Sequence, residues 1–156
     1  MLIRRAEERD MPRIRELLLQ VANVHHAGRP DLFQRDHSKY SDEELLAILR
    51  NETTPVLVAV DGGERVLGYA FCIYEQPDGE HVLSPVKTLY IDDLCVDEAC
   101  RGQGVGSRLY RAVLDMARAA GCYNVTLNVW SCNGDAMAFY EKMGLCPQKI
   151  GMEQLL

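Results

Sequence analysis

The sequence predicts one α/β domain, in which helices flank both faces of a mixed, mostly antiparallel sheet. The chain has 156 residues, the usual length of a single domain, and 47% of them are hydrophobic. Segments with strand and helix periodicity follow one another in the order β-α-α-β-β-β-α-β-α-β. Glycine turns favour antiparallel neighbours, whereas a helix that connects two strands favours a parallel pair.

The N-terminal part of the chain predicts one strand and two helices. Residues 1–5 form the strand, and Asp10 is the expected N-cap of the first helix. The apolar positions that recur there at helical spacing are Ile14, Leu17, Leu18 and Val21. Residues 23–39 lack a clear period and are predicted to be a loop. Ser41 and Glu44 form a capping box that begins a second, short helix.

The middle of the chain predicts a hairpin and a central strand. Strands are expected at residues 56–61 and 65–74, joined around Gly62 and Gly63. Residues 76–85 are polar and predict a turn region. The central strand follows at residues 87–96.

The C-terminal third predicts two helices and two strands. A helix over residues 105–120 has one apolar face and ends at Gly121. Residues 123–130 are rich in strand-forming side chains, and residues 133–143 form the next helix. A last strand is expected at residues 150–155.

Composition limits the classes of function. No apolar run approaches the roughly 20 residues that span a bilayer, and no signal peptide begins the chain, so a cytoplasmic protein without membrane contact is expected. The net charge of −6 argues against nucleic-acid binding and suits a cationic or neutral small partner. The six cysteines form no C-x-x-C pair, and the histidines lack paired ligand spacing, so no metal site is expected.

The most informative segment is a glycine-rich turn between the central strand and the long helix. It reads Arg101-Gly102-Gln103-Gly104-Val105-Gly106. Glycines let a ligand approach the backbone closely, and the first amides of a helix are unpaired donors, so this turn predicts a phosphate site. A dinucleotide-binding unit fits less well, because it requires the spacing G-x-G-x-x-G and a later acidic residue. A plain helix cap is the structural alternative.

Two motifs together resemble the GNAT superfamily of acetyl-coenzyme A (acetyl-CoA) dependent N-acetyltransferases. The first is Arg101-x-x-Gly104-x-Gly106, and the second is the helix that begins at Asn133 and ends at Gly144-Leu145. The strand Tyr90-Ile91-Asp92-Asp93-Leu94-Cys95-Val96 is similar to a Glu-Asp-apolar strand of the spermidine/spermine (diamine) acetyltransferase branch. Asp92 stands where that branch has Glu, and its shorter side chain favours action through a water.

The resemblance implies a coenzyme site. The amides of Gln103 through Ser107 would hold the pyrophosphate, and those of Leu94 and Val96 would face the pantetheine and the thioester carbonyl. The full set of expected coenzyme-binding residues is Leu94, Cys95, Val96, Arg101, Gly102, Gln103, Gly104, Val105, Gly106, Ser107, Asn133, Tyr140 and Lys142.

The resemblance also implies the catalytic groups. Tyr140 would protonate the departing thiolate, since a phenol of pKa about 10 keeps its proton at pH 7. Asp92 and Asp93 are candidate bases for the amine. In a regular strand they point to opposite faces, so at most one faces a given pocket unless a bulge re-aims the other. The structural alternative is an ion pair with an arginine. Asp31, Phe33 and Tyr40 could line the acceptor pocket, since an acid and aromatic rings suit a cation.

The predicted function is transfer of an acetyl group from acetyl-CoA to a primary amine of a small molecule, such as a polyamine or an amino-acid-like compound. The amine would attack directly in a ternary complex; Cys95 as an acetyl-carrying nucleophile is a less favoured mechanism. A non-catalytic acyl-CoA sensor or assembly module, and an enzyme that acetylates peptide or protein amines, are the alternatives. A homodimer is compatible with this fold.

Overall fold

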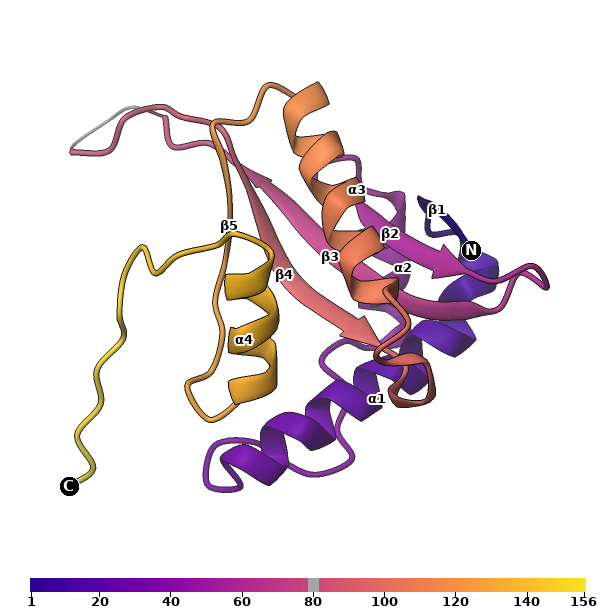
Figure 1. Cartoon of the computed structure of the whole chain (residues 1–156), viewed down its shortest axis with the longest axis horizontal. Coiled ribbons are helices and arrows are strands. Elements are labelled where there is room, and N and C mark those ends of the chain that lie inside the picture. Colours follow the sequence, from indigo (N-terminus) through magenta and orange to yellow (C-terminus); the bar gives the residue numbers. More distant parts are fainter. Residues whose placement is uncertain (79–81) are drawn as a thin grey trace.

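A computed structural model describes residues 1–78 and 82–156, and it contains one five-stranded sheet. The strand order is β1-β2-β3-β4-β5, with antiparallel pairing from β1 to β4 and parallel pairing of β4 with β5 (Figure 1). The strands are β1 (Leu2–Arg5), β2 (Val56–Val60), β3 (Val66–Glu75), β4 (Thr88–Val96) and β5 (Asn124–Leu127). The predicted mixed, mostly antiparallel sheet is confirmed. The polar turn expected at 76–85 includes residues 79–81, which lie outside the described residues.

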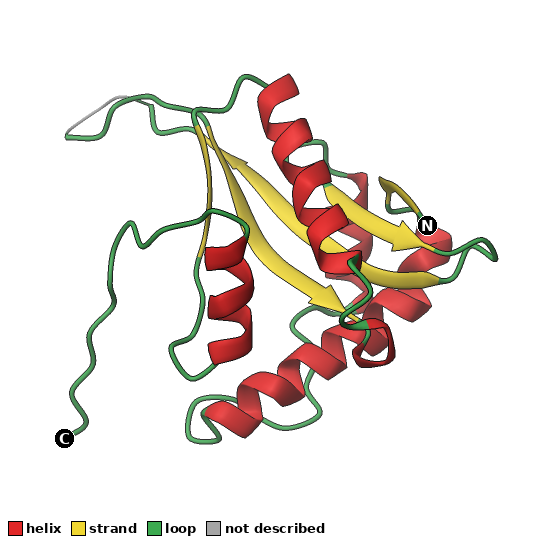
Figure 2. Cartoon of the chain, in the orientation of Figure 1, coloured by secondary structure: helices red, strands yellow, loops and turns green. Residues whose placement is uncertain are grey.

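Helices cover both faces of the sheet (Figure 2), as the sequence predicts. They are α1 (Met11–Gly28), α2 (Asp42–Arg50), α3 (Val105–Ala119) and α4 (Gly134–Lys142). On one face, Leu17 and Leu45 of α1 and α2 pack in a buried cluster with Tyr69 of β3. On the other face, Leu109 of α3 packs in a second cluster with Ala70 of β3. The alternation of side chains along β3 therefore separates two cores, one for each pair of helices.

Helix α1 is longer than predicted and begins differently. It continues to Gly28, so the expected loop at 23–39 is wrong for its first six residues. The last turns of α1 lie close to the start of α4, since a side chain at position 28 would collide with the Cys132 sulfur. These turns of α1 have no continuous apolar stripe in the sequence. Asp10 does not cap α1 with its side chain; its carboxylate instead accepts hydrogen bonds from Arg4 at 2.7 and 3.0 Å and from the Glu7 amide.

The predicted capping box of α2 is confirmed, and α4 also begins with a side-chain cap. The Ser41 hydroxyl accepts from the Glu44 amide at 3.2 Å, and the Glu44 carboxylate accepts from the Ser41 amide at 2.8 Å. The Asn133 side chain accepts from the Ala136 amide at 3.2 Å at the start of α4.

The last predicted strand is wrong. Residues 150–155 form no strand. The chain after α4 is extended (Figure 1), and its Glu153 forms an ion pair with Arg29, just after α1, at 2.8 Å. Ile150 and Met152 are 77% and 89% exposed. The hydrophobic residues there have strand propensity, but a strand needs a pairing partner, and this segment has none within the described chain. Across the described helices, none has both the length and the apolar character of a membrane span.

Candidate active site

An opening between β4 and β5 forms the centre of the candidate site. Strand β4 stays paired with β3 as far as Val96, but its pairing with β5 stops at Ile91 and Leu127. Beyond that pair the two strands diverge (Figure 1). The edge of β4 from Asp92 to Val96 therefore has no strand partner in the described part of the chain, so its outward-facing amides lack the sheet acceptors they would otherwise have.

The direction of the β4 amides follows from the pairing with β3. The amide of Asp97, the residue after β4, donates to the Leu67 carbonyl on the β3 side at 2.9 Å. Successive amides of an extended chain point to opposite edges, so those of Val96 and Leu94 point toward the opening. These are the two amides that the sequence resemblance assigned to the thioester and the pantetheine.

The glycine turn is separated from β4 by a short 3-10 turn (Glu98–Cys100) and leads into the N-terminus of α3. Gly102 and Gly104 have φ angles of 75° and 79°, which side chains other than glycine rarely adopt. The amide of Arg108 donates to the Gly104 carbonyl at 3.1 Å, so the three amides before it have no partner inside the helix. The first turn of α3 contains no acidic residue. Unpaired donors and the positive end of a helix dipole make this turn suitable for a phosphate group.

Three other predicted coenzyme residues lie after β4, on α3 and on α4. Arg101 is exposed, and its Nε donates to the Val96 carbonyl at 3.4 Å, so the guanidinium lies beside the end of β4. A side chain on Gly106 would lie 3.3 Å from the Phe139 ring, so glycine here permits α3 and α4 to pack closely. Lys142 is exposed in the last turn of α4.

A β-bulge places Asp92 and Asp93 on the same face of the sheet. Asp93 is paired with Phe71, whereas Ile91 is paired with Cys72, so Asp92 is an extra residue in β4. Asp93 lies opposite Phe71 on the face that α1 and α2 cover, and the Asp92 carboxylate reaches the same side, where it accepts a hydrogen bond from Tyr40. The strict alternation expected for a regular strand is therefore broken here, as the bulge alternative had allowed.

Each carboxylate has a different polar partner. The Tyr69 hydroxyl donates to Asp93 at 3.0 Å, while Lys39 forms an ion pair with Asp92 at 2.8 Å. Burial raises the pKa of Asp93 to about 6, so this carboxylate can exchange a proton near neutral pH. Among the described residues, neither aspartate forms an ion pair with an arginine; the ion pair that Asp92 does form is with Lys39.

Tyr140 approaches the same site from α4. Its ring packs against Phe139 at 5.2 Å between centroids, and its hydroxyl has no hydrogen-bond partner among the described side chains and backbone groups. Burial, together with the negative charge of Asp93, raises the pKa of Tyr140 well above its usual value. The phenol therefore keeps its proton at neutral pH, and its hydroxyl can donate a hydrogen bond to a ligand.

Cys95 is poorly suited to act as a nucleophile. Its side chain is buried in the core cluster beneath α1, and its Sγ donates to the Leu17 carbonyl at 3.6 Å. Burial raises the pKa of this thiol to about 12, so the reactive thiolate is scarce at neutral pH.

The three predicted acceptor residues do not lie together. Tyr40 contacts Asp92 and stacks on Phe71, at 5.6 Å between ring centroids. Phe33 lies between the rings of His25 and Trp130, at 5.1 Å from each. Asp31 instead forms an ion pair with Arg29 at 2.7 Å.

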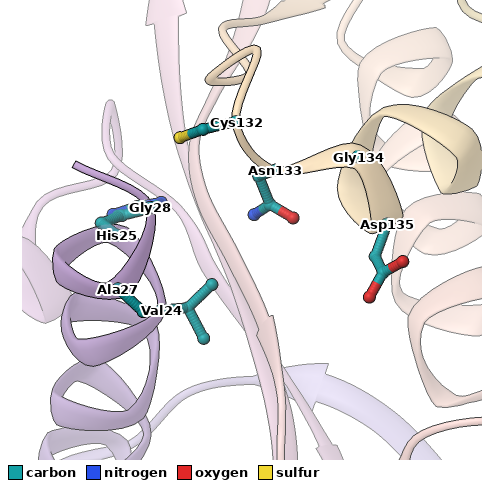
Figure 3. A pocket seen from close by; sticks show the side chains of 8 residues that line it. All are labelled: Val24, His25, Ala27, Gly28, Cys132, Asn133, Gly134 and Asp135. Carbon is teal, nitrogen blue, oxygen red and sulfur yellow. The ribbon is translucent and has the colours of Figure 1, made fainter.

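A pocket of about 420 Å³ lies between the last turns of α1 and the start of α4 (Figure 3). His25 and Asn133 line it from opposite sides, with Cys132 and Asp135 beside Asn133 (Figure 3). Burial lowers the pKa of His25, and the charge of Lys39 lowers it further, so both favour the neutral imidazole. The pocket does not include the two aspartates or Tyr140. No group of three or more potential metal ligands occurs within residues 1–78 and 82–156.

Sequence reasoning missed Lys39, Tyr69, His25 and Trp130. Tyr69 could have been suspected, since it lies on the hairpin strand that pairs with the aspartates. Lys39 carries no local signal, because its contact with Asp92 joins positions 53 residues apart.

Comparison with known proteins points to one family of acetyltransferases. Residues 11–145 match the model of the acetyltransferase (GNAT) family. A region of 63 residues is 36% identical to glucosamine 6-phosphate N-acetyltransferase 1 of Oryza sativa subsp. japonica, and it covers 40% of this chain and 36% of that protein. Thialysine N-epsilon-acetyltransferase of Bos taurus is 27% identical over 92% of this chain and 82% of its own length.

Solved structures agree with the fold. A crystal structure of a mutant BH1408 protein from Bacillus halodurans has a TM-score of 0.96 and 33% identity, covering 100% of this chain and 99% of that one. An aminoglycoside acetyltransferase from an uncultured soil metagenomic sample has a TM-score of 0.74 at 22% identity, covering 99% and 95% of the two chains, and this likeness concerns the fold alone.

Proposed function

Because the chain belongs to the acetyltransferase (GNAT) family, we propose that it is an enzyme that transfers an acetyl group from acetyl-CoA to a primary amine of a small molecule. The observation that carries this proposal is the opening between β4 and β5. Two aspartates lie on one side of it, and Tyr140 of α4 has a hydroxyl without a hydrogen-bond partner among residues 1–78 and 82–156. A protein that only binds a coenzyme needs neither an acidic face nor a free proton donor.

The coenzyme would lie along the opening. Its pyrophosphate would bind the amides of residues 103–107 at the start of α3, with Arg101 adding positive charge nearby. The pantetheine would pair with the free edge of β4. The amides of Leu94 and Val96 would then face it, and one of them would donate to the thioester oxygen and stabilise its developing negative charge.

The acceptor amine would approach from the face that carries Asp92 and Asp93. An alkyl ammonium of pKa about 10.4 is neutral for only about one molecule in a thousand near pH 7.4, a cost of roughly 4 kcal/mol. Asp93, with its raised pKa of about 6, or Asp92 acting through a water, would take the proton as the amine attacks. As the new C–N bond forms and the C–S bond breaks, Tyr140 would give its proton to the departing thiolate.

The surroundings favour a cationic acceptor. Two carboxylates and the ring of Tyr40 share one side of the site, and acids with aromatic rings suit an ammonium group. The names of the relatives, which mention glucosamine 6-phosphate and thialysine, support a small amine rather than a protein. A polyamine or an amino-acid-like compound is therefore our proposed substrate class.

The test is release of CoA thiol from acetyl-CoA across a panel of polyamines, amino acids, aminosugars, aminoglycosides and short peptides. We expect saturable turnover with one class of small amine. Turnover with peptides alone would favour a protein acceptor. Absence of turnover, with coenzyme binding shown by calorimetry, would contradict the enzyme and favour the binding module.

A further inference from the structure

A primary amine of the chain itself already lies at the proposed reaction centre. Lys39, just before α2, places its Nζ 2.8 Å from the Asp92 carboxylate and 3.3 Å from the Asp92 backbone carbonyl. Ile91 is the last β4 residue paired with β5, so the Asp92 carbonyl is the first one beyond that pair. The ammonium group therefore lies where the opening for the coenzyme begins.

The contacts hold the aspartate as well as the lysine. The Tyr40 hydroxyl donates to the same carboxylate oxygen that receives Lys39, and the Tyr40 ring is fixed by stacking on Phe71. The Lys39 side chain remains 44% exposed, so the amine keeps freedom to move toward a bound thioester.

The other lysines have different surroundings. Lys87 lies over the Tyr74 ring and donates to the Ala120 carbonyl at 3.1 Å. Lys142 and Lys149 are exposed on the surface. Within the described chain, only Lys39 forms an ion pair with an aspartate of β4.

From this placement we infer that the protein acetylates its own Lys39, a modification that rests on the proposed acetyl transfer from acetyl-CoA. The Lys39 ammonium gives one proton to Asp92, and the neutral Nζ attacks the thioester carbon. A C–N bond forms, the C–S bond breaks, and CoA leaves as a thiolate that takes a proton from Tyr140 and becomes the free thiol. The nitrogen loses its second proton through water to the Tyr140 phenolate, which restores the phenol, and Asp92 later releases its proton to solvent. The product is an uncharged amide at position 39, which no longer pairs with Asp92.

The experiment incubates the wild-type protein with acetyl-CoA and no acceptor, and measures acetylation of each lysine by mass spectrometry over time. A base beside the amine should make Lys39 react roughly 10²-fold faster than the more exposed Lys142 and Lys149, which serve as internal controls for direct chemical acetylation. The rate constant should not depend on protein concentration, because donor site and lysine belong to one molecule. Asp92→Asn, with its fold checked by circular dichroism, should lower the Lys39 rate to that of Lys142.

Two results would overturn the inference. Lys39 could react no faster than Lys142 and Lys149 in the wild-type protein, or its rate could rise with protein concentration, which would place the lysine of one copy in the site of another. The same preparation is assayed with the amine panel. Turnover of a small amine without selective Lys39 acetylation would overturn self-acetylation alone, whereas loss of both would overturn the proposed function as well.

Discussion

Replacing Tyr140 by phenylalanine should lower the rate of acetyl transfer and leave the stability of the fold almost unchanged. The phenylalanine ring keeps the contact with Phe139, and the lost hydroxyl has no hydrogen-bond partner among the described residues. No hydrogen bond is broken, so the free energy of unfolding should change by less than about 0.5 kcal/mol.

The expected loss appears in the rate of transfer. A positioned general acid contributes about 10²–10⁴-fold. A thiolate whose conjugate acid has a pKa of about 8.5 is already a fair leaving group, so we expect the lower end, about 10²-fold or 2.7 kcal/mol in the barrier. The affinity for acetyl-CoA should stay unchanged.

The assay is thiol release at saturating acetyl-CoA with the preferred amine, together with calorimetric binding of the coenzyme and thermal unfolding. Tyr110→Phe is the matched control, since Tyr110 is a buried core residue of α3 to which no catalytic role is assigned. If Tyr140→Phe keeps a kcat within about threefold of the wild-type value, the assignment of the proton donor is refuted.

Three further perturbations test other parts of the structure. Asp97→Asn should lower the free energy of unfolding by about 3 kcal/mol in urea titrations, because Asp97 is 3% exposed and ion-paired, whereas the exposed Asp115→Asn should cost under about 0.5 kcal/mol. Asp93 must be ionised to accept a proton, and its pKa is about 6, so kcat should fall about tenfold per pH unit below pH 6. Asp93→Asn should remove this pH dependence. If the variant keeps the same fall in kcat at acidic pH, Asp93 is not the base. Gly104→Ala adds a methyl group that contacts no other atom, but alanine is strained at a φ of 79°. We therefore expect the free energy of unfolding to fall by about 1–2 kcal/mol and calorimetry to show weaker coenzyme binding. The control Gly62→Ala should cause neither change.

The parts of the fold that were predictable from the sequence depend on local interactions. The Ser41 capping box and the Asn133 cap each involve residues three positions apart, and periodicity reveals the buried face of a helix. The glycine turn was visible because positive φ angles leave a signature in the residue type itself.

The parts that failed depend on partners distant in the sequence. The bulge at Asp92 exists only as a mismatch between two strands, so neither strand reveals it alone. The hydrophobic pattern after residue 149 predicted a strand, but no neighbouring strand within the described residues receives it. The end of α1 was missed because its last turns lie beside α4 and lack an apolar stripe.

The incomplete pairing of β4 with β5 has a consequence for the folding equilibrium. A ligand that fills the opening supplies backbone partners that the sheet itself lacks, and it does so only when the chain is folded. Such a ligand at 100 times its dissociation constant adds about 2.7 kcal/mol to the free energy of unfolding. With acetyl-CoA as that ligand, the fraction of chains that is unfolded, and so open to proteolysis, would fall as the cosubstrate becomes abundant.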